Sequence, residues 1–332
     1  MIGLCLAALE QVLGVYCLTL GRLQPARQEP SCYASTCMHL YEWVSHAPST
    51  RLDNSQRPTT LTRLPHNMTN RRRPRKRFGQ HFLHDPGVIA RIVASMHIQA
   101  NDTVVEIGPG QGALTTALLS QVERLQVIEL DRDLIPALQR DCATLGELTV
   151  HAADALSFDY RQLAPAPAGL RVCGNLPYNI STPLLFHLLA QAEAIADMHF
   201  LLQKEVVQRL AAAPGGGDYG RLSVMVQYHC QVEQLFKVSA GAFWPVPQVE
   251  SAVVRLRPHR PLPHPVQNYE LFADLVRQAF GQRRKTLRNA LKGWANEAAL
   301  EAAGIAPETR AERVTVAAFV ALANHLSRPA QP

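Results

Sequence analysis

The chain has 332 residues, of which 47% are hydrophobic and 18% charged, which excludes a disordered, collagen-like or fibrous protein. Lys and Arg outnumber Asp and Glu by 33 to 27, and this formal net charge of +6 favours an anionic partner. The seven cysteines form no CxxC pair, so we expect no disulfide framework and no metal cluster, as in a soluble cytoplasmic protein.

The first 67 residues differ in pattern from the rest of the chain. Residues 1–20 are apolar but contain Glu10 and Gln11, and no basic segment precedes them, so neither a signal peptide nor a membrane span is expected. Residues 24–67 lack periodicity, which indicates disorder. We expect Met68 to be the true start and residues 1–67 to be a non-native or disordered extension. A genuine targeting or regulatory extension is the alternative.

From residue 85 to residue 211 the pattern alternates between helices and strands. Apolar residues at helical spacing predict a helix over residues 85–98, with Asp85 as its N-cap. Strands are expected at residues 103–108, 125–130, 148–154, 170–176 and 198–203, with helix-like segments between most of them. This alternation predicts an α/β fold with a parallel sheet that has helices on both faces.

The remaining third of the chain predicts a different organisation. Residues 221–238 and 249–258 resemble two consecutive strands, which we expect to form an antiparallel hairpin at the sheet edge. Four prolines in residues 258–265 indicate a linker. From Tyr269 onward the pattern is helical. We therefore expect one domain over residues 68–258 and a small all-α domain over residues 259–332.

A glycine loop follows the first expected strand of the sheet. Gly108, Gly110 and Gly112 precede a helix, where backbone N–H groups favour a negatively charged ligand group. The spacing is GxGxG, and the GxGxxG of dinucleotide binders places its third glycine one residue later, so a nicotinamide cofactor is disfavoured. An ordinary tight turn is the alternative.

Two acidic residues end the next two expected strands. Glu129 lies about 20 positions after the loop, where a carboxylate can accept hydrogen bonds from ribose hydroxyls. Asp154 is placed to accept from an adenine amino group, or simply to cap a loop. Carboxyl ends of neighbouring parallel strands share one crevice. S-adenosyl-L-methionine fits this set, because it has a ribose, an adenine and a carboxylate but no pyrophosphate.

The fourth expected strand ends in Asn175, Leu176, Pro177 and Tyr178. The exocyclic amine of adenine is a poor nucleophile because its lone pair is delocalised into the ring. The Asn175 side-chain oxygen and the Leu176 carbonyl can each accept one amine hydrogen, which aims the lone pair at a methyl donor. Pro177 stiffens the turn, and Tyr178 offers a ring for base stacking. A turn with a buried tyrosine is the alternative.

These motifs belong to a longer set that resembles the bacterial small-subunit ribosomal RNA adenine dimethyltransferases, the kasugamycin-sensitivity methyltransferases. The resemblance covers about residues 75–326. It is carried by RKRFGQHFL (75–83), EIGPGQGALT (106–115), VIELDRDL (127–134), GNLPYNISTPLLFHLL (174–189), LQKEVVQRL (202–210), YGRLSVMVQY (219–228), VPQVESAVVRL (246–256) and FGQRRKTLRNAL (280–291).

The resemblance implies a Rossmann-like methyltransferase sheet and dimethylation of two adjacent adenines near the 3′ end of 16S rRNA, within the small ribosomal subunit or its precursor. It also implies a monomer. The donor site is implied for the residues His81, Leu83, Gly108, Glu129, Asp154 and Asn175, and base stacking for Phe243. One departure is His81, where the family often has Asn; imidazole can still donate a hydrogen bond.

Two basic clusters are predicted to contact RNA phosphates. The first comprises Arg75, Lys76 and Arg77 within the run from Arg71, and the second comprises Arg283, Arg284, Lys285 and Arg288. Solvated charged faces are the alternative interpretation of both.

Three alternatives to the small-subunit enzyme remain open from the sequence. The macrolide-resistance type shares the motifs but acts on large-subunit RNA. A non-catalytic assembly or RNA-binding factor is the second alternative. A DNA adenine methyltransferase is the weakest, because nothing in the sequence predicts an element that reads duplex DNA.

Overall fold

The computed structural model describes residues 80–282 and 284–327. Four sets of predictions fall on residues outside these ranges. They concern the extension over residues 1–67, the start at Met68, the first basic cluster (Arg75, Lys76 and Arg77) and Arg283 of the second.

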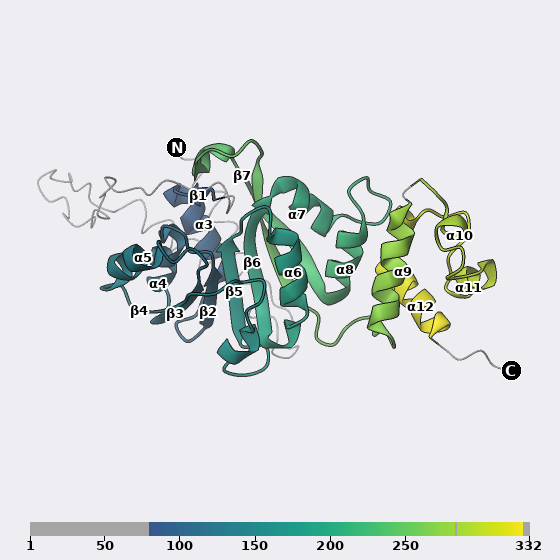
Figure 1. Cartoon of the computed structure of the whole chain (residues 1–332), viewed down its shortest axis with the longest axis horizontal. Coiled ribbons are helices and arrows are strands. Elements are labelled where there is room, and N and C mark those ends of the chain that lie inside the picture. Colours follow the sequence, from purple (N-terminus) through teal and green to yellow (C-terminus); the bar gives the residue numbers. More distant parts are fainter. Residues whose placement is uncertain (1–79, 283, 328–332) are drawn as a thin grey trace, which may run out of the picture. The chain divides into compact units, whose positions relative to one another are not determined.

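A seven-stranded sheet lies at the centre of the described part, with the strand order β4-β3-β2-β5-β6-β9-β7 (Figure 1). The first five strands in this order are parallel, and β9 is antiparallel to both of its neighbours. The predicted parallel sheet with an antiparallel edge hairpin is therefore confirmed. The strands are β2 (Thr103–Ile107), β3 (Arg124–Ile128), β4 (Glu147–His151), β5 (Leu170–Asn175), β6 (Ile195–Gln203), β7 (Cys230–Val238) and β9 (Ser251–Pro258).

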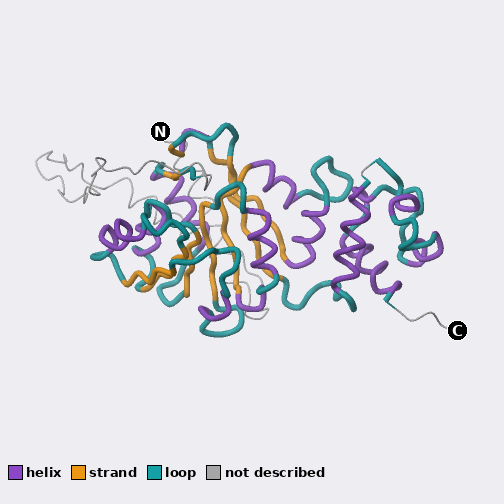
Figure 2. The backbone as a smooth tube through the Cα atoms, viewed as in Figure 1, coloured by secondary structure: helices purple, strands orange, loops and turns teal. Residues whose placement is uncertain are grey.

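Helices cover both faces of the sheet, as Figure 2 shows with strands in orange and helices in purple. Side chains alternate along each strand, so Val172 of β5 packs into one core and Cys173 into the other. The first core takes residues from α6 (Ser181–Leu189) and α7 (Lys204–Ala211). The second takes them from α3 (Pro86–Met96), α4 (Ala113–Leu119) and α5 (Ile135–Cys142).

The prediction of a strand over all of residues 221–238 is wrong. Only the second half is a strand, β7, and the first half is the helix α8 (Arg221–His229). Val226 of this helix packs into a core of the sheet, whereas Val224 and Met225 pack against the C-terminal helices. The helix is short and its apolar residues face two cores, so hydrophobic periodicity does not distinguish it from a buried strand.

The C-terminal part is helical, as predicted. Its elements are α9 (Tyr269–Gly281), α10 (Leu287–Ala290), α11 (Glu297–Ala302) and α12 (Val316–Leu326). Their core includes α8, because the Tyr228 and Phe272 rings lie 4.8 Å apart. It also includes Tyr219, just before α8, whose hydroxyl donates to the Val314 carbonyl at 2.9 Å. The domain boundary at residue 258 stays a prediction, and this core contains residues on both sides of it.

A second, two-stranded sheet joins distant parts of the chain. The strand β1 (Phe82–Leu83) pairs antiparallel with β8 (Phe243–Trp244), and Leu83 lies opposite Phe243. Directly after β1, the Asp85 carboxylate accepts a hydrogen bond from the Val88 N–H at 3.0 Å and caps α3, as predicted. The 3₁₀ helices are η3 (Tyr160–Leu163), η4 (Ala192–Ala194), η5 (Ala240–Ala242) and η6 (Ala311–Arg313).

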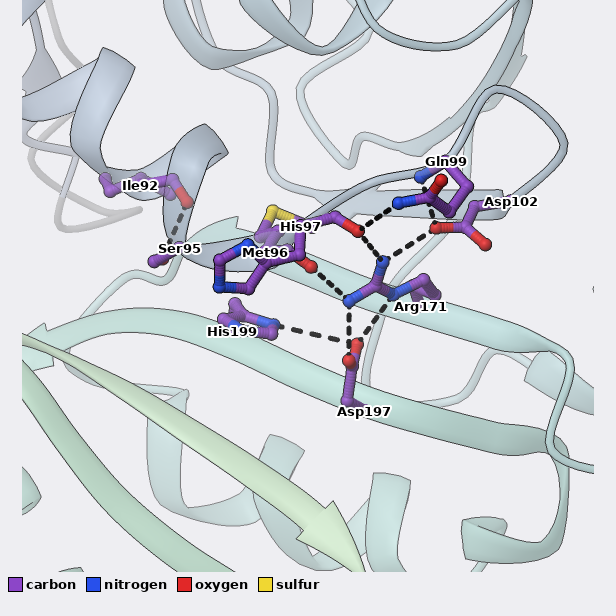
Figure 3. A network of polar contacts seen from close by, with 9 residues as sticks. All are labelled: Ile92, Ser95, Met96, His97, Gln99, Asp102, Arg171, Asp197 and His199. Atoms are coloured by element: carbon purple, nitrogen blue, oxygen red, sulfur yellow. Dashed lines mark hydrogen bonds and ion pairs between the residues drawn. The ribbon is translucent and has the colours of Figure 1, made fainter. Parts of the chain in front are cut away.

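A polar network around Arg171 fastens the C-terminal end of α3 to the sheet (Figure 3). The Arg171 guanidinium pairs with Asp102 and with Asp197, each at 2.7 Å, and donates to the carbonyls of Met96 and His97. Burial raises the pKa of Asp197, but the nearby His199 and Arg171 lower it more strongly, so that it falls to about 2. Arg171 thus satisfies helix-end carbonyls and favours the charged form of the Asp197 carboxylate.

Candidate active site

The carboxyl ends of the parallel strands open into a cavity. Such an edge is where open α/β sheets bind ligands. The lining includes every residue predicted to hold the methyl donor or to form the catalytic motif, with Phe243 as the exception: His81, Leu83, Gly108, Gly110, Glu129, Asp154, Asn175, Leu176, Pro177 and Tyr178.

The glycine loop lies at one wall of this cavity and has a backbone that favours glycine. Gly108 and Gly110 have φ values of 66° and 58°, in the left-handed region. A Cβ on Gly110 would lie 2.9 Å from the Phe82 ring, whereas a Cβ on Gly108 would meet no atom within 4 Å. The loop therefore leaves an open space that a side chain at residue 108 would begin to fill, as the close approach of a ligand requires.

Glu129 connects the end of β3 to this loop. Its carboxylate accepts from the Gly110 N–H at 3.1 Å and from the Asp131 N–H at 2.8 Å. Burial raises the pKa of Glu129, and the two backbone hydrogen bonds act against this increase. The carboxylate is thus fixed at the position from which the sequence predicted contact with a ribose.

Asp154 follows β4 and is exposed at the cavity. One carboxylate oxygen accepts from the Leu156 N–H at 2.9 Å, so Asp154 also has the loop-capping role that was its alternative interpretation. A carboxylate has acceptor sites left after one such bond, so capping and ligand binding are compatible.

Glu106 is a buried acidic residue on the cavity wall that we did not single out from the sequence. It lies on β2 with 2% of its surface exposed and accepts from the Thr115 hydroxyl at 2.7 Å. Burial raises the pKa of Glu106 to about 8, although the bond from Thr115 lowers it. The carboxyl group is therefore mainly protonated at neutral pH. The signal for it in the sequence is an acidic residue inside an otherwise apolar strand.

Asn175 ends β5, and its amide is fixed by a backbone group from a distant segment. Its Nδ2 donates to the His81 carbonyl at 2.7 Å. This bond uses the donor end of the amide, which leaves the Oδ1 atom to accept a hydrogen bond. The next residue, Leu176, is buried and its N–H donates to the Leu201 carbonyl of β6 at 3.2 Å. The first two residues of the motif are therefore held by neighbouring segments on both sides.

Tyr178 is held at its hydroxyl and at one face of its ring. Its hydroxyl oxygen lies 2.8 Å from the Ser251 Oγ. The His81 ring stacks on the Tyr178 ring with centroids 5.6 Å apart and planes at 27°. The His81 Nδ1 in turn donates to the Pro245 carbonyl at 2.7 Å. The structure shows that His81 supports the catalytic motif, and its contact with the methyl donor stays a prediction.

Phe243 does not line the cavity. The residue is 1% exposed, pairs with Leu83 across β1 and β8, and packs in the same core as Leu83. This placement matches the alternative interpretation, in which the aromatic residues of the segment fill core. Stacking of Phe243 on a target base stays a prediction.

The described residues of the second basic cluster are exposed. Arg284 and Lys285 precede α10, and Arg288 lies on it. Arg288 pairs with Glu297 at 3.5 Å and with Glu308 at 4.0 Å. Part of its charge is therefore balanced within the protein, whereas Arg284 and Lys285 are the better candidates for phosphate contacts.

Within residues 80–282 and 284–327, no group of three or more His, Cys, Asp or Glu side chains is arranged to hold a metal ion. In the same ranges, no helix is both long enough and apolar enough to cross a bilayer.

The fold and this cavity define an α/β methyltransferase, an enzyme of the class that uses S-adenosyl-L-methionine. The family model described as ribosomal RNA adenine dimethylase matches residues 71–328, and the chain belongs to this family.

Curated relatives and solved structures are similar over most of this chain. The ribosomal RNA small subunit methyltransferase A of Pseudomonas fluorescens is 58% identical over 260 residues, covering 78% of this chain and 96% of the relative. That of Alcanivorax borkumensis is 58% identical, covering 77% and 91%. A dimethyladenosine transferase from Plasmodium falciparum has a TM-score of 0.64 at 27% identity, covering 73% and 96%. The 23S rRNA methyltransferase ErmE has a TM-score of 0.60 at 27% identity, covering 74% and 100%.

Proposed function

We propose that the protein dimethylates the N6 amines of two adjacent adenines near the 3′ end of 16S rRNA, in the small ribosomal subunit or its precursor. The observation that carries this proposal is the fixed Asn175 amide, which presents an acceptor oxygen in a cavity that also contains the glycine loop. Support for the small subunit as target comes from the names of the relatives at 58% identity. The large-subunit enzyme ErmE is only 27% identical.

The residues of the cavity fit S-adenosyl-L-methionine. The open space at Gly108 and the loop N–H groups suit a closely approaching ligand, and Glu129 can accept from ribose hydroxyls. Asp154 can accept from the adenine amino group at the exposed side. When bound, this donor supplies a methyl group on a positively charged sulfur.

The chain's own groups prepare the target amine. The Asn175 Oδ1 and the Leu176 carbonyl accept the two amine hydrogens, which pulls the nitrogen toward a tetrahedral shape and directs its lone pair. Pro177 limits the motion of the Leu176 carbonyl. The Tyr178 ring stacks on the base. A general base is not required before attack, because the amine loses its proton after methylation.

Phosphate contacts are proposed for Arg284 and Lys285 of the second basic cluster, because Arg288 is paired with Glu297 and Glu308. Replacement of both Arg284 and Lys285 with Ala is expected to weaken binding to the small subunit, because it removes contacts to phosphates that do not depend on RNA sequence. It is also expected to lower the slope of log affinity against log salt concentration by roughly 1 to 2. Filter binding across a salt series measures this slope. The paired Arg288→Ala is the control, with a smaller change in slope, and an unchanged slope in the double variant would contradict the role.

We also propose that the enzyme acts as a cytoplasmic monomer.

Methyl transfer from labelled S-adenosyl-L-methionine tests the proposed target. The substrates are small subunits that lack dimethyladenine, large subunits and duplex DNA. Label confined to the small subunit is the expected result. Label on the large subunit indicates the resistance type, and ribosome binding without label indicates a non-catalytic factor.

A further inference from the structure

Ser251, the first residue of β9, is buried directly behind the catalytic motif. Its exposed fraction is 0%, and its Oγ lies 2.8 Å from the Tyr178 hydroxyl oxygen. The residue is more than 70 positions from the motif in the chain, and the antiparallel pairing of β9 with β6 brings it there opposite Gln203. Tyr178 is thus attached at the outer end of its ring to the main sheet.

The same ring is supported on one face by His81. The His81 ring stacks at 5.6 Å, and its bond to the Pro245 carbonyl keeps it in that place. A planar base can therefore stack only on the opposite face of Tyr178. The hydroxyl bond and the covered face act on different motions, because the first restrains sideways displacement of the outer end of the ring and the second restrains rotation of the ring about its long axis.

We propose that Ser251 is a positioning residue for the target adenine. By fixing the Tyr178 hydroxyl, it keeps the ring in the orientation in which a stacked base presents its N6 amine to Asn175 and Leu176. Transfer of a methyl group depends steeply on this alignment. The inference rests on the proposed function, since it presumes a base stacked on Tyr178.

A double-mutant cycle with Ser251→Ala and Tyr178→Phe tests the proposal, because each variant removes the same hydrogen bond from one side. Ser251→Ala is expected to lower kcat on small subunits about 5-fold, as the loss of one hydrogen bond predicts. The Kd of S-adenosyl-L-methionine, measured by calorimetry, is expected to stay unchanged. In the Tyr178→Phe background, Ser251→Ala is expected to cause no further loss.

Ser223→Ala is the matched control, because Ser223 is also 0% exposed and its hydroxyl donates to the Arg209 carbonyl, away from the cavity lining. Its melting temperature reports the general cost of removing a buried serine hydroxyl, and its kcat is expected to match the unmodified chain. Additive losses in the cycle, or an equal loss of kcat in Ser223→Ala, would overturn the proposal.

The proposed function and the role of Ser251 are separable. If the unmodified chain methylates only large subunits, the proposed function fails and the cycle is measured on that substrate. The position of the ring can be measured without substrate: in a crystal structure of Ser251→Ala, the Tyr178 ring is expected to be displaced at its outer end or to adopt more than one orientation. A Tyr178 ring with the same single orientation in both proteins would also overturn the proposal.

Discussion

The proposed role of Asn175 requires both the donor atom and the acceptor atom of its amide group. The Nδ2 atom donates to the His81 carbonyl, and this bond determines which way the oxygen points. Only a side chain with a donor and an acceptor on one carbon can satisfy this carbonyl and also receive an amine hydrogen. The identity of the side chain at this position is therefore set by its supporting segment as well as by the substrate.

The variant Asn175→Asp tests that dual requirement. It keeps an acceptor but places a carboxylate oxygen against the His81 carbonyl oxygen, which repels it. We expect methyl transfer to fall about 100-fold or more in both Asn175→Asp and Asn175→Ala, a loss typical of removing one positioned group that acts in the transition state. Rates of transfer from labelled donor provide the comparison. Near-normal rates in the Asp variant would show that the donated bond is unimportant.

Glu106 gives the protein a pH-dependent stability. Its pKa is raised from 4.5 to about 8 by burial, so the folded protein binds a proton that the unfolded chain releases above pH 4.5. The contribution of Glu106 to the free energy of unfolding is complete below pH 4.5 and is lost as the pH rises to about 8. The loss is on the order of 5 kcal/mol. Glu129, whose pKa is also raised, adds a change of the same sign.

Replacement of Glu106 with Gln is therefore expected to flatten this pH dependence. Free energies of unfolding in urea, measured between about pH 5 and pH 9, give the two slopes. The amide keeps the volume of the side chain and can accept from Thr115, so the variant remains folded. A slope as steep in Glu106→Gln as in the unmodified chain would assign the effect to other groups.

Helix α3 shows how an element outside the cavity lining supports the site. Its N-terminal end follows β1 and the His81 carbonyl, and its C-terminal end is fixed by Arg171. The Arg171 side chain is 13% exposed, as is that of Asp197, whereas Arg124 and Glu147 form an exposed pair at 79% and 65%. The two arginines differ in burial and in the number of their partners, so Arg124 shows the effect of losing a single exposed ion pair.

Replacement of Arg171 with Met is expected to lower the free energy of unfolding by about 3–5 kcal/mol, because it leaves buried carboxylates without their partner. The same replacement at the exposed Arg124 is expected to change it by less than about 1 kcal/mol. Urea denaturation of both variants provides the test. Equal losses of unfolding free energy at the two positions would show that the buried network stabilises the fold no more than the exposed ion pair does.

The elements also show where sequence patterns are sufficient. The alternation of short apolar strands and amphipathic helices predicted the parallel sheet, because each strand is followed by turn residues and a change of period. It failed for α8, whose apolar residues face two cores and so show no single helical face. The cavity residues at strand ends followed from the same pattern, since parallel strands place their carboxyl ends at one edge.

Contacts made by tertiary pairing could not be predicted in this way. The bonds of His81 to Asn175 and of Tyr178 to Ser251 join segments more than 70 residues apart, and nothing local in the sequence specifies such partners. Phe243 and Glu106 are similar cases. The burial of Phe243 depends on the pairing of β1 with β8, and the raised pKa of Glu106 depends on the side chains packed over β2.

At the scale of the whole molecule, the sheet and the C-terminal helices depend on each other through α8. Residues of the α8 region, including Tyr219 and Tyr228, are buried by side chains from beyond the proline-rich segment. A chain ending at Pro258 would expose this apolar face, although the sequence predicts a domain boundary there.

We therefore expect a chain that ends at Pro258 to melt at a lower temperature and to bind a hydrophobic dye. Calorimetry and dye fluorescence measure the two effects. Tyr219→Phe is the control, since it removes only the bond to the Val314 carbonyl and costs about 1 kcal/mol. A truncated chain as stable as the full chain would show that the methyltransferase part folds independently.

The central claim is that this cavity methylates two neighbouring adenines of small-subunit RNA at N6. The most direct measurement is to incubate undermethylated small subunits with the donor and the protein, and then to locate the modified bases by primer extension and identify them by nucleoside mass spectrometry. We expect N6,N6-dimethyladenosine at two adjacent positions near the 3′ end of 16S rRNA, and none with Asn175→Ala. Dimethyladenosine elsewhere, or equal modification by the Asn175→Ala variant, would contradict it.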